Sequence, residues 1–191
     1  MPLNVPNLIT LSRIILIPLI IAIFYVPDEW LSFSGKNMTA TAIFIFAAVT
    51  DWLDGYLARK LNQMSAFGAF LDPVADKLIV VGALIVLLKE GRVDTVVALI
   101  IIGREIAISA LREWMAKVGQ AKSVAVAFIG KLKTLSQMVA IPLLLLYDDN
   151  LFSLVDCSVL GTILINVAAV LTVVSMLYYL RKALPYASVR G

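Results

Sequence analysis

The stretch FGAFLDPVADKLIVVGALIVLL, residues 67–88, combines the two properties that decide the fold. It is long enough to cross a bilayer as one helix, because about 20 apolar residues span the hydrocarbon core. Its first half nevertheless carries Asp72, Asp76 and Lys77, whereas its second half has no charge. A charged group inside a span costs about 2.5–3.5 kcal/mol and therefore marks a candidate functional site. The stretch predicts a transmembrane helix that is purely apolar at one end and carries reactive groups at the other.

Five further apolar stretches of similar length accompany it in a chain of 191 residues that is 61% hydrophobic, with a mean hydropathy of +0.97. Soluble domains are only about 45–50% apolar. The linkers are short and leave no room for a large soluble domain. We therefore expect one all-α membrane domain over residues 1–191, with six transmembrane helices. The predicted spans are Val5–Val26, Met38–Leu57, Phe67–Leu88, Thr95–Met115, Val124–Tyr147 and Val159–Leu180.

Lysine and arginine are distributed unequally over the two sides of these spans. Eight lie on the side that holds both termini, and three lie on the opposite side. The positive-inside rule then places both termini in the cytoplasm. The net charge of +3 serves this orientation and predicts no nucleic-acid partner. The first stretch is longer than a signal-peptide core and lacks a basic start, so we expect it to be retained as a span.

The charges within the spans lie in the halves nearest the cytoplasm, and the outer halves carry none. A transporter needs polar groups near the midplane and an exit on both faces. An enzyme that acts on a lipid head group needs a pocket open to one leaflet and the cytosol. The distribution favours a membrane enzyme with a cavity open to the cytoplasmic side. A divalent-cation transporter and a structural membrane subunit with buried ion pairs are the alternatives from other classes.

Four aspartates form two stripes at helical spacing. Asp51 and Asp54 share a face of the second span, and Asp72 and Asp76 share a face of the third. If the stripes face each other, four like charges converge in a low-dielectric site and repel, unless divalent cations neutralise them. The chain has no histidine and only Cys157 as a thiol, so a metal would be held by oxygen ligands. Such ligands suit Mg²⁺, Mn²⁺ or Ca²⁺.

The aspartates belong to a longer pattern, D-x-x-D-G-x-x-A-R, followed after eight residues by G-x-x-x-D-x-x-x-D. Through this pattern, which has no missing position, the chain resembles the CDP-alcohol phosphatidyltransferase family. Polar residues near the amino terminus and segments of the fourth and fifth spans extend the resemblance. The matching residues are Asp51, Asp54, Gly55, Ala58, Arg59, Gly68, Asp72 and Asp76; Asn7, Thr10 and Arg13; Gly103-Arg104-Glu105 and residues 109–115; and residues 130–134 with Gln137-Met138.

The resemblance implies transfer of a phosphatidyl group from CDP-diacylglycerol, assisted by two divalent ions, Mg²⁺ or Mn²⁺. It implies that the four aspartates hold these ions and that Asp76 is also the general base. It further implies a homodimer in the bacterial cytoplasmic (inner) membrane, with acyl chains entering laterally from the surrounding lipids. The cytidine end of the lipid would be held near Asp54, Gly55, Ala58, Arg59 and Gly68.

The acceptor alcohol is indicated only by the fourth and fifth spans, which resemble the family members that use glycerol 3-phosphate and release CMP. Capture of this dianion requires cations. The candidates are Arg104, Arg112 and Lys131, with Lys133, Thr134 and Arg13 as additional residues. The residues alone leave other acceptors open, namely inositol phosphate, serine or phosphatidylglycerol.

Overall fold

The structure, a computed structural model, describes residues 5–60, 66–120, 128–147 and 156–186, apart from the side chains of residues 5–7, 52, 54–59, 66, 67, 69 and 128. These described residues form six α-helices and one short 3-10 helix, and no strand occurs among them. The predicted all-α class is therefore confirmed. The elements are α1 (Val5–Ile23), α2 (Phe33–Lys60), α3 (Ala66–Lys89), α4 (Thr95–Lys117), α5 (Phe128–Leu146), α6 (Cys157–Ala183) and η3 (Leu184–Tyr186).

Each predicted span coincides with one helix, and the differences are confined to the helix ends. α1 stops at Ile23 rather than Val26, because the chain there continues in turns, with the amide of Tyr25 bonded to the carbonyl of Ala22 at 2.9 Å. α2 begins at Phe33, before the apolar run that defined the predicted span. Residues 124–127 of the fifth predicted span lie outside the described residues.

The helices group into two compact units. The first unit comprises Met1–Arg92 and Pro142–Ser158, and so contains α1, α2, α3 and the last turn of α5. The second unit comprises Val93–Ile141 and Val159–Gly191, with α4, most of α5, and α6 apart from its first two residues. The chain passes between the units after Arg92, within α5 at Pro142, and after Ser158. The single domain expected from the length stays a prediction.

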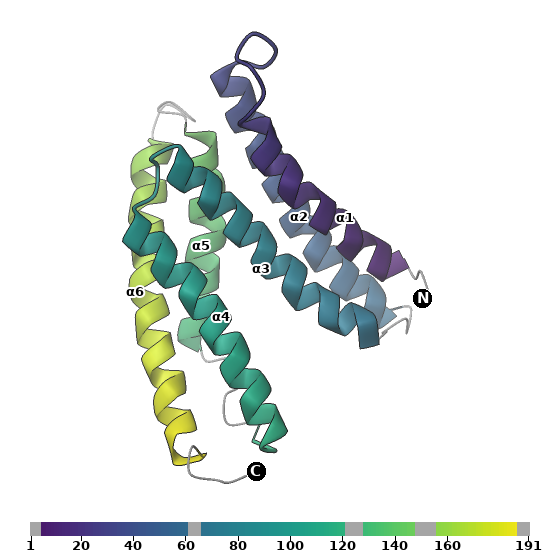
Figure 1. Cartoon of the computed structure of the whole chain (residues 1–191), viewed down its shortest axis with the longest axis vertical. Coiled ribbons are helices and arrows are strands. Elements are labelled where there is room, and N and C mark those ends of the chain that lie inside the picture. Colours follow the sequence, from purple (N-terminus) through teal and green to yellow (C-terminus); the bar gives the residue numbers. More distant parts are fainter. Residues whose placement is uncertain (1–4, 61–65, 121–127, 148–155, 187–191) are drawn as a thin grey trace. The chain divides into compact units, whose positions relative to one another are not determined.

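In the first unit, α1 packs along both α2 and α3 (Figure 1). Gly82 of α3 allows this approach, because a Cβ atom there would come within 2.9 Å of the Cγ2 atom of Ile17 on α1. Ile20, Phe44 and Leu84 contribute one core side chain from each helix, and each is at most 2% exposed. This packing fixes the polar start of α1 against its neighbours.

In the second unit, α4 packs on α6 through one apolar cluster. Ile108 and Met115 on α4 meet Tyr179 and Ala183 on α6, and all four are buried. α4 is capped at its start by Asp94, whose carboxylate accepts a hydrogen bond from the amide of Val96 at 2.7 Å. The cluster holds the charged second half of α4 against α6.

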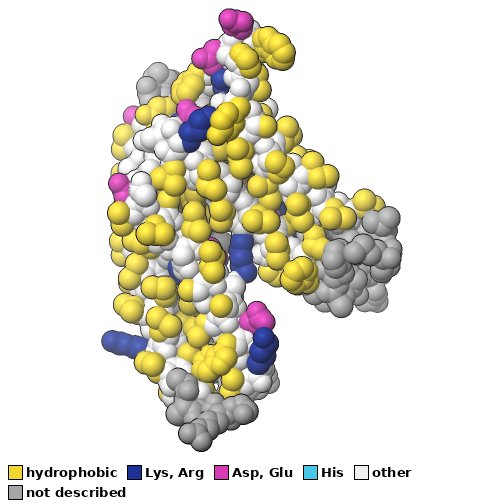
Figure 2. Space-filling model, viewed as in Figure 1, with side chains coloured by type: hydrophobic (Ala, Val, Ile, Leu, Met, Phe, Trp, Pro, Cys, Tyr) yellow, Lys and Arg dark blue, Asp and Glu magenta, His cyan; other side chains and the backbone are white. Residues whose placement is uncertain are grey.

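Large apolar side chains are exposed on all six α-helices, and Figure 2 shows hydrophobic side chains over much of the visible face. Soluble monomers rarely expose extended apolar patches. Two segments, Ile129–Leu146 and Cys157–Tyr186, are long and apolar enough to cross a bilayer. Charged residues interrupt the apolar runs of α3 and α4, which therefore do not meet the same criterion. The surface and these two helices are those expected of a membrane protein.

Candidate active site

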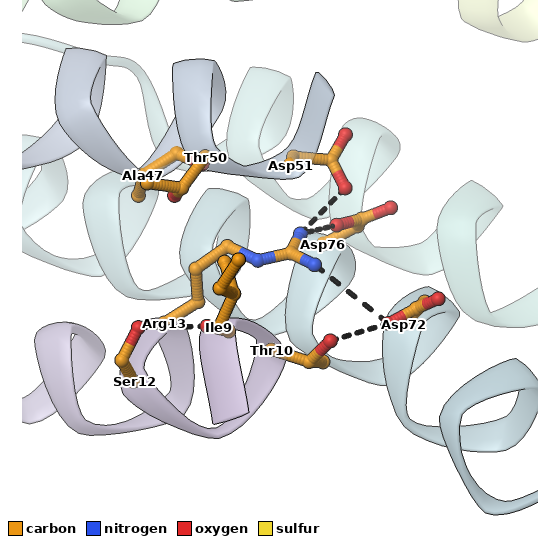
Figure 3. A network of polar contacts seen from close by, with 9 residues as sticks. All are labelled: Ile9, Thr10, Ser12, Arg13, Ala47, Thr50, Asp51, Asp72 and Asp76. Carbon is orange, nitrogen blue, oxygen red and sulfur yellow. Dashed lines mark hydrogen bonds and ion pairs between the residues drawn. The ribbon is translucent and has the colours of Figure 1, made fainter. Parts of the chain in front are cut away.

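Three carboxylates from two helices converge on the guanidinium of Arg13 (Figure 3). The Nη1 atom of Arg13 donates to Oδ1 of Asp51 at 2.6 Å and to Oδ1 of Asp76 at 2.5 Å. The Nη2 atom lies 3.7 Å from Oδ1 of Asp72. One cation on α1 thereby pairs with carboxylates of both α2 and α3 and offsets part of their negative charge.

The hydroxyl of Thr10 completes this group. It donates to Oδ1 of Asp72 at 2.6 Å. Thr10 and Arg13 are three residues apart on α1, and Asp72 and Asp76 are four apart on α3, so each pair shares one helix face. The polar face of α1 therefore meets the carboxylate stripe of α3.

Burial differs sharply between the cation and its partners. Arg13 and Thr10 are each 1% exposed. The side chains of Asp51, Asp72 and Asp76 are 44–45% exposed. Solvent, an ion or a substrate phosphate can therefore reach the carboxylates, while the guanidinium behind them is shielded.

The site matches a hard divalent cation in its type of ligand, since all its acidic groups are carboxylates. As they stand, no three carboxylate, thiol or imidazole groups of the described residues are grouped so as to hold one ion. The Arg13 guanidinium instead lies at the point on which Asp51, Asp72 and Asp76 converge (Figure 3). The residues thus fit a metal ion in donor chemistry and in charge, with an arginine supplying the positive charge here.

The rest of the sequence pattern is only partly described. Gly68 is buried on α3, one helical turn before Asp72. The backbone of α2 is helical through Lys60, which continues the helix that carries Asp51. The side-chain positions of Asn7, Asp54, Gly55, Ala58 and Arg59 lie outside the described part of the chain. The nucleotide-binding role assigned to α2 stays a prediction.

In the second unit, Glu105 gathers two of the predicted acceptor residues. Nη1 of Arg104 lies 3.4 Å from Oε1 of Glu105, and Nζ of Lys133 on α5 donates to the same oxygen. Arg104 is 8% and Lys133 1% exposed. Two cations share one carboxylate, which leaves one positive charge in excess. The Nε atom of Arg104 is buried and has no hydrogen-bond partner among the described residues, so the cluster has both charge and a donor available for an anion.

Arg112 lies two turns further along α4 in a different setting. Its guanidinium stands 5.5 Å from the ring centroid of Tyr179 on α6. Its Nε atom is buried without a hydrogen-bond partner in the described part of the chain. The neighbouring Glu113 pairs with Lys117 at 2.9 Å instead. Arg112 therefore keeps its positive charge uncompensated by a described carboxylate.

The remaining acceptor candidates do not join the group around Glu105. Lys131 is exposed on α5, and the hydroxyl of Thr134 donates to the carbonyl of Gly130 in its own helix at 3.0 Å. Neither contacts Arg104 or Glu105 among the interactions of the described residues. Arg13, which the sequence grouped with these cations, contacts the aspartates of the first unit. The structure thus brings together Arg104 and Lys133 and assigns Arg13 to the other group.

A third buried arginine, Arg92, was not singled out by the sequence. Its Nη1 atom donates to the carbonyls of Leu144 and Leu145 at 3.0 and 2.8 Å, and its Nη2 atom donates to Oδ1 of Asn37 at 2.7 Å. The ring of Tyr147 lies 4.5 Å from the guanidinium carbon. Burial lowers the pKa of Arg92, and the nearby Glu90 charge opposes this shift.

In the sequence, Arg92 follows the end of an apolar run and is therefore expected to be an exposed linker charge. The signal for its burial is the preceding Gly91, which has φ +70° and ends α3. This left-handed turn returns the chain, so that the amide of Arg92 donates to the carbonyl of Leu87 at 2.8 Å. A glycine in this position directs the next side chain back toward the helices.

Comparison with known proteins agrees with this arrangement. Residues 3–174 match the CDP-alcohol phosphatidyltransferase family. Proteins named CDP-diacylglycerol--glycerol-3-phosphate 3-phosphatidyltransferase from Escherichia coli (strain K12) and Shigella flexneri serotype 5b (strain 8401) are 49% identical over 185 residues, or 96% of each chain. The protein of that name from Salmonella choleraesuis (strain SC-B67) is 48% identical over the same share. The match takes in the helices of both units and the aspartates that converge on Arg13, and the chain belongs to the CDP-alcohol phosphatidyltransferase family.

Proposed function

We propose that this enzyme transfers the phosphatidyl group of CDP-diacylglycerol to glycerol 3-phosphate, giving phosphatidylglycerol phosphate and CMP. The observation that carries the proposal is the near-complete match to relatives named for this reaction. The convergence of Asp51, Asp72 and Asp76 supports it, because phosphoryl transfer from a diphosphate needs concentrated charge at one place.

Asp51, Asp54, Asp72 and Asp76 are proposed to hold two divalent ions, Mg²⁺ or Mn²⁺. Such ions, when bound, neutralise the diphosphate and stabilise the negative charge that develops on the departing CMP. The half-exposed carboxylates of the three described aspartates support this role, since a ligand can reach them without unfolding the helices. Gly55, Ala58, Arg59 and Gly68, with Asp54, are proposed to receive the cytidine diphosphate part of the lipid.

Asp76 is proposed as the general base. The glycerol hydroxyl attacks the phosphorus atom nearest the diacylglycerol, its proton passes to the Asp76 carboxylate, and the bond to the CMP oxygen breaks with its electron pair. A positioned carboxylate typically contributes about 10²–10⁴-fold to such a step. Arg13 holds Oδ1 of Asp76 at 2.5 Å, which orients this carboxylate on α3.

The cations of the second unit are proposed to bind the phosphate of glycerol 3-phosphate. Arg104 and Lys133 exceed their shared partner Glu105 by one charge, and Arg112 adds a second uncompensated charge among the described residues. Two positive charges match the dianion. Lys131 and Thr134 on α5 are proposed to contribute from the same helix as Lys133.

The six helices are proposed to cross the bacterial inner membrane, with both termini and the aspartates on the cytoplasmic side, as a homodimer. The unequal distribution of Lys and Arg supports the orientation. Tyr25, Trp30 and Phe33, around the turn between α1 and α2, are 69%, 83% and 51% exposed. Exposed aromatic residues of this kind are typical of a membrane interface, here on the predicted outer side.

The decisive experiment offers the purified protein CDP-diacylglycerol together with glycerol 3-phosphate, inositol phosphate, serine or phosphatidylglycerol, and measures CMP release with Mg²⁺ or with EDTA. We expect glycerol 3-phosphate to react fastest and EDTA to stop the reaction. Faster turnover of another alcohol would overturn the acceptor and keep the chemistry. Full activity in EDTA would overturn the metal site. Metal uptake by proteoliposomes without CMP release would favour the transporter.

A further inference from the structure

A buried arginine lies where the aspartates of the proposed metal site converge. Arg13 is 1% exposed and contacts Asp51, Asp72 and Asp76 through its two terminal nitrogens. Each of these contacts with a described aspartate goes to its Oδ1 atom. Figure 3 shows the guanidinium pointing into the space between the carboxylates of α2 and α3. A cation that is part of the chain therefore uses oxygens that a metal ion would also need.

We propose that Arg13 is a resident counter-ion of this site, which partly neutralises the aspartates in the metal-free enzyme and competes with divalent cations for their oxygens. The inference rests on the proposed function, because it takes these aspartates as the metal ligands. It adds that metal affinity is set in part by a residue that is not itself a metal ligand.

The aspartates and the guanidinium of Arg13 would each be unfavourable without the other. Three carboxylates on two packed helices repel one another at low dielectric when nothing neutralises them. A guanidinium that is 1% exposed is equally unfavourable without anionic partners. The two groups therefore stabilise each other, and the packing of α1 on α2 and α3 does not depend on a bound metal.

Competition follows from the shared oxygens. A divalent cation that binds Oδ1 of Asp51 and Asp76 must weaken or displace the bonds that Nη1 of Arg13 makes to the same atoms at 2.6 and 2.5 Å. Part of the binding free energy of the metal is therefore used to release Arg13. If Arg13 is replaced by a neutral side chain, the metal should bind at least about tenfold to a hundredfold more tightly, since the loss of a single charge-assisted contact from the metal-free state already corresponds to this range.

The test measures Mn²⁺ binding to the purified full-length protein in detergent, from the electron paramagnetic resonance signal of free Mn²⁺. We expect the dissociation constant of Arg13→Gln to fall about tenfold to a hundredfold below that of the wild type. Ser12→Ala is the matched control, because Ser12 is the exposed neighbour on α1 whose hydroxyl bonds to the carbonyl of Ile9 in its own helix. The Mn²⁺ dissociation constant of Ser12→Ala should stay within about twofold of that of the wild type.

Thermal unfolding gives a second readout that a merely structural role would not produce. Without metal, Arg13→Gln should unfold at a lower temperature than the wild type, because the aspartates have lost their counter-ion. Added Mn²⁺ should raise its unfolding temperature by more than it raises that of the wild type or of Ser12→Ala. A variant that folds only with Mn²⁺ present would also support the proposal.

Arg13→Lys keeps the test valid if Arg13→Gln does not fold in either condition. Lysine retains the charge with a single terminal nitrogen, so its Mn²⁺ affinity should lie between those of the other two proteins. The proposal is overturned if Arg13→Gln binds Mn²⁺ no more tightly than the wild type does. Where only Arg13→Lys folds, the same outcome for Arg13→Lys overturns it. Wild-type Mn²⁺ affinity in Asp76→Asn and Asp51→Asn would instead overturn the metal site of the proposed function.

Discussion

Two arginines of the first unit are almost fully buried, and their partners are of opposite kinds. Arg13 is 1% exposed and faces three carboxylates that are each nearly half exposed. Arg92 is 8% exposed and faces two backbone carbonyls, the amide of Asn37 and aromatic rings. The first arginine is held by ionised side chains that a ligand can approach. The second is held by neutral groups that the fold fixes.

The difference separates a functional arginine from a structural one. The carbonyls of Leu144 and Leu145 lie in the last turn of α5, so Arg92 satisfies acceptors that have no other donor within the described part of the helix. The aspartates around Arg13 are 44–45% exposed, so another cation can reach them. The accessible carboxylates around Arg13 can bind a ligand, whereas the neutral partners of Arg92 only stabilise the packing of the helices.

The largest expected effect is on turnover, at the aspartates. Asp76→Asn should lower turnover by about 10²–10⁴-fold, to the detection limit, because the amide neither accepts the hydroxyl proton nor supplies its charge. Asp51→Asn, Asp54→Asn and Asp72→Asn should also abolish turnover. CMP release from protein that is inserted and folded is the measurement.

Asn37→Ala is the matched control, since it likewise removes a polar partner of a buried arginine. Its turnover per folded molecule should stay close to that of the wild type. If Asn37→Ala lost as much turnover as Asp76→Asn, the distinction between the two arginines would be wrong.

The next effect is on stability, at Arg92. Arg92→Met leaves the carbonyls of Leu144 and Leu145 and the amide of Asn37 without their donor. Each unpaired buried group costs about 1–3 kcal/mol, so we expect a loss of about 3 kcal/mol or more. At about 2–4 °C per kcal/mol, the unfolding temperature should fall by at least about 6–12 °C. Thermal unfolding in detergent, followed by circular dichroism, measures it.

Lys89→Met provides the comparison for Arg92→Met. Lys89 is a nearby cation that donates to the carbonyl of Phe24 at 3.2 Å and stands 3.8 Å from the centroid of the Tyr25 ring. Its side chain is 40% exposed, so water can replace its contacts and the unfolding temperature should change little. Equal losses for both variants would mean that the burial of Arg92 contributes nothing specific.

The helices and one of the two sites could largely be predicted from the sequence. Residues 67–88 correspond to α3 with only the helix ends moved, to Ala66 and Lys89, because a predominantly apolar stretch of this length favours one continuous helix although it carries charges in its first half. The spacing of Asp72 and Asp76 placed both on one helix face, and Asp51 meets them as two facing stripes would.

The partners of single cations could not be predicted. Spacing fixes which residues share a helix face, but it does not fix the rotation of one helix against another. Arg13 was therefore grouped with the acceptor cations, although α1 turns it toward the aspartates of α2 and α3. The shared contact of Arg104 and Lys133 with Glu105 was invisible for the same reason, since Glu105 and Lys133 lie on different helices.

Arg112 shares features with both Arg13 and Arg92 and so tests the comparison between them. Like Arg92 it lies beside an aromatic ring, but no described carboxylate or carbonyl satisfies it. We therefore expect Arg112 to bind substrate rather than to stabilise the fold. Arg112→Ala should raise the KM for glycerol 3-phosphate about tenfold to a hundredfold, since it removes one charge-assisted contact of about 1.5–3 kcal/mol. Lys131→Ala should act in the same direction, and the KM for CDP-diacylglycerol should change little in either.

Lys117→Ala is the control for Arg112→Ala, because Lys117 forms an exposed pair with Glu113 on the same helix. It should leave both KM values unchanged. Arg59→Ala should show the opposite preference and weaken CDP-diacylglycerol more than glycerol 3-phosphate. Equal effects of Arg59→Ala and Arg112→Ala on both substrates would contradict the separation of a nucleotide side from an acceptor side.

The smallest expected effect is at Thr10, whose hydroxyl donates to Oδ1 of Asp72 at 2.6 Å. Thr10→Val keeps the shape of the side chain and removes this donor. A hydrogen bond to a charged group contributes about 1.5–3 kcal/mol, but the Asp72 side chain is 44% exposed and water can replace the lost donor. We therefore expect turnover to fall by about tenfold or less, with Mn²⁺ affinity changed by a similar factor, while Thr10→Ser, which keeps the hydroxyl, stays close to the wild type.

A loss in Thr10→Val as large as that of Asp76→Asn would mean that the orientation of Asp72, and not only its charge, is essential. An equal loss in Thr10→Ser would show that Thr10 acts through packing of its methyl group against the neighbouring helices, because only the methyl group differs between the two side chains.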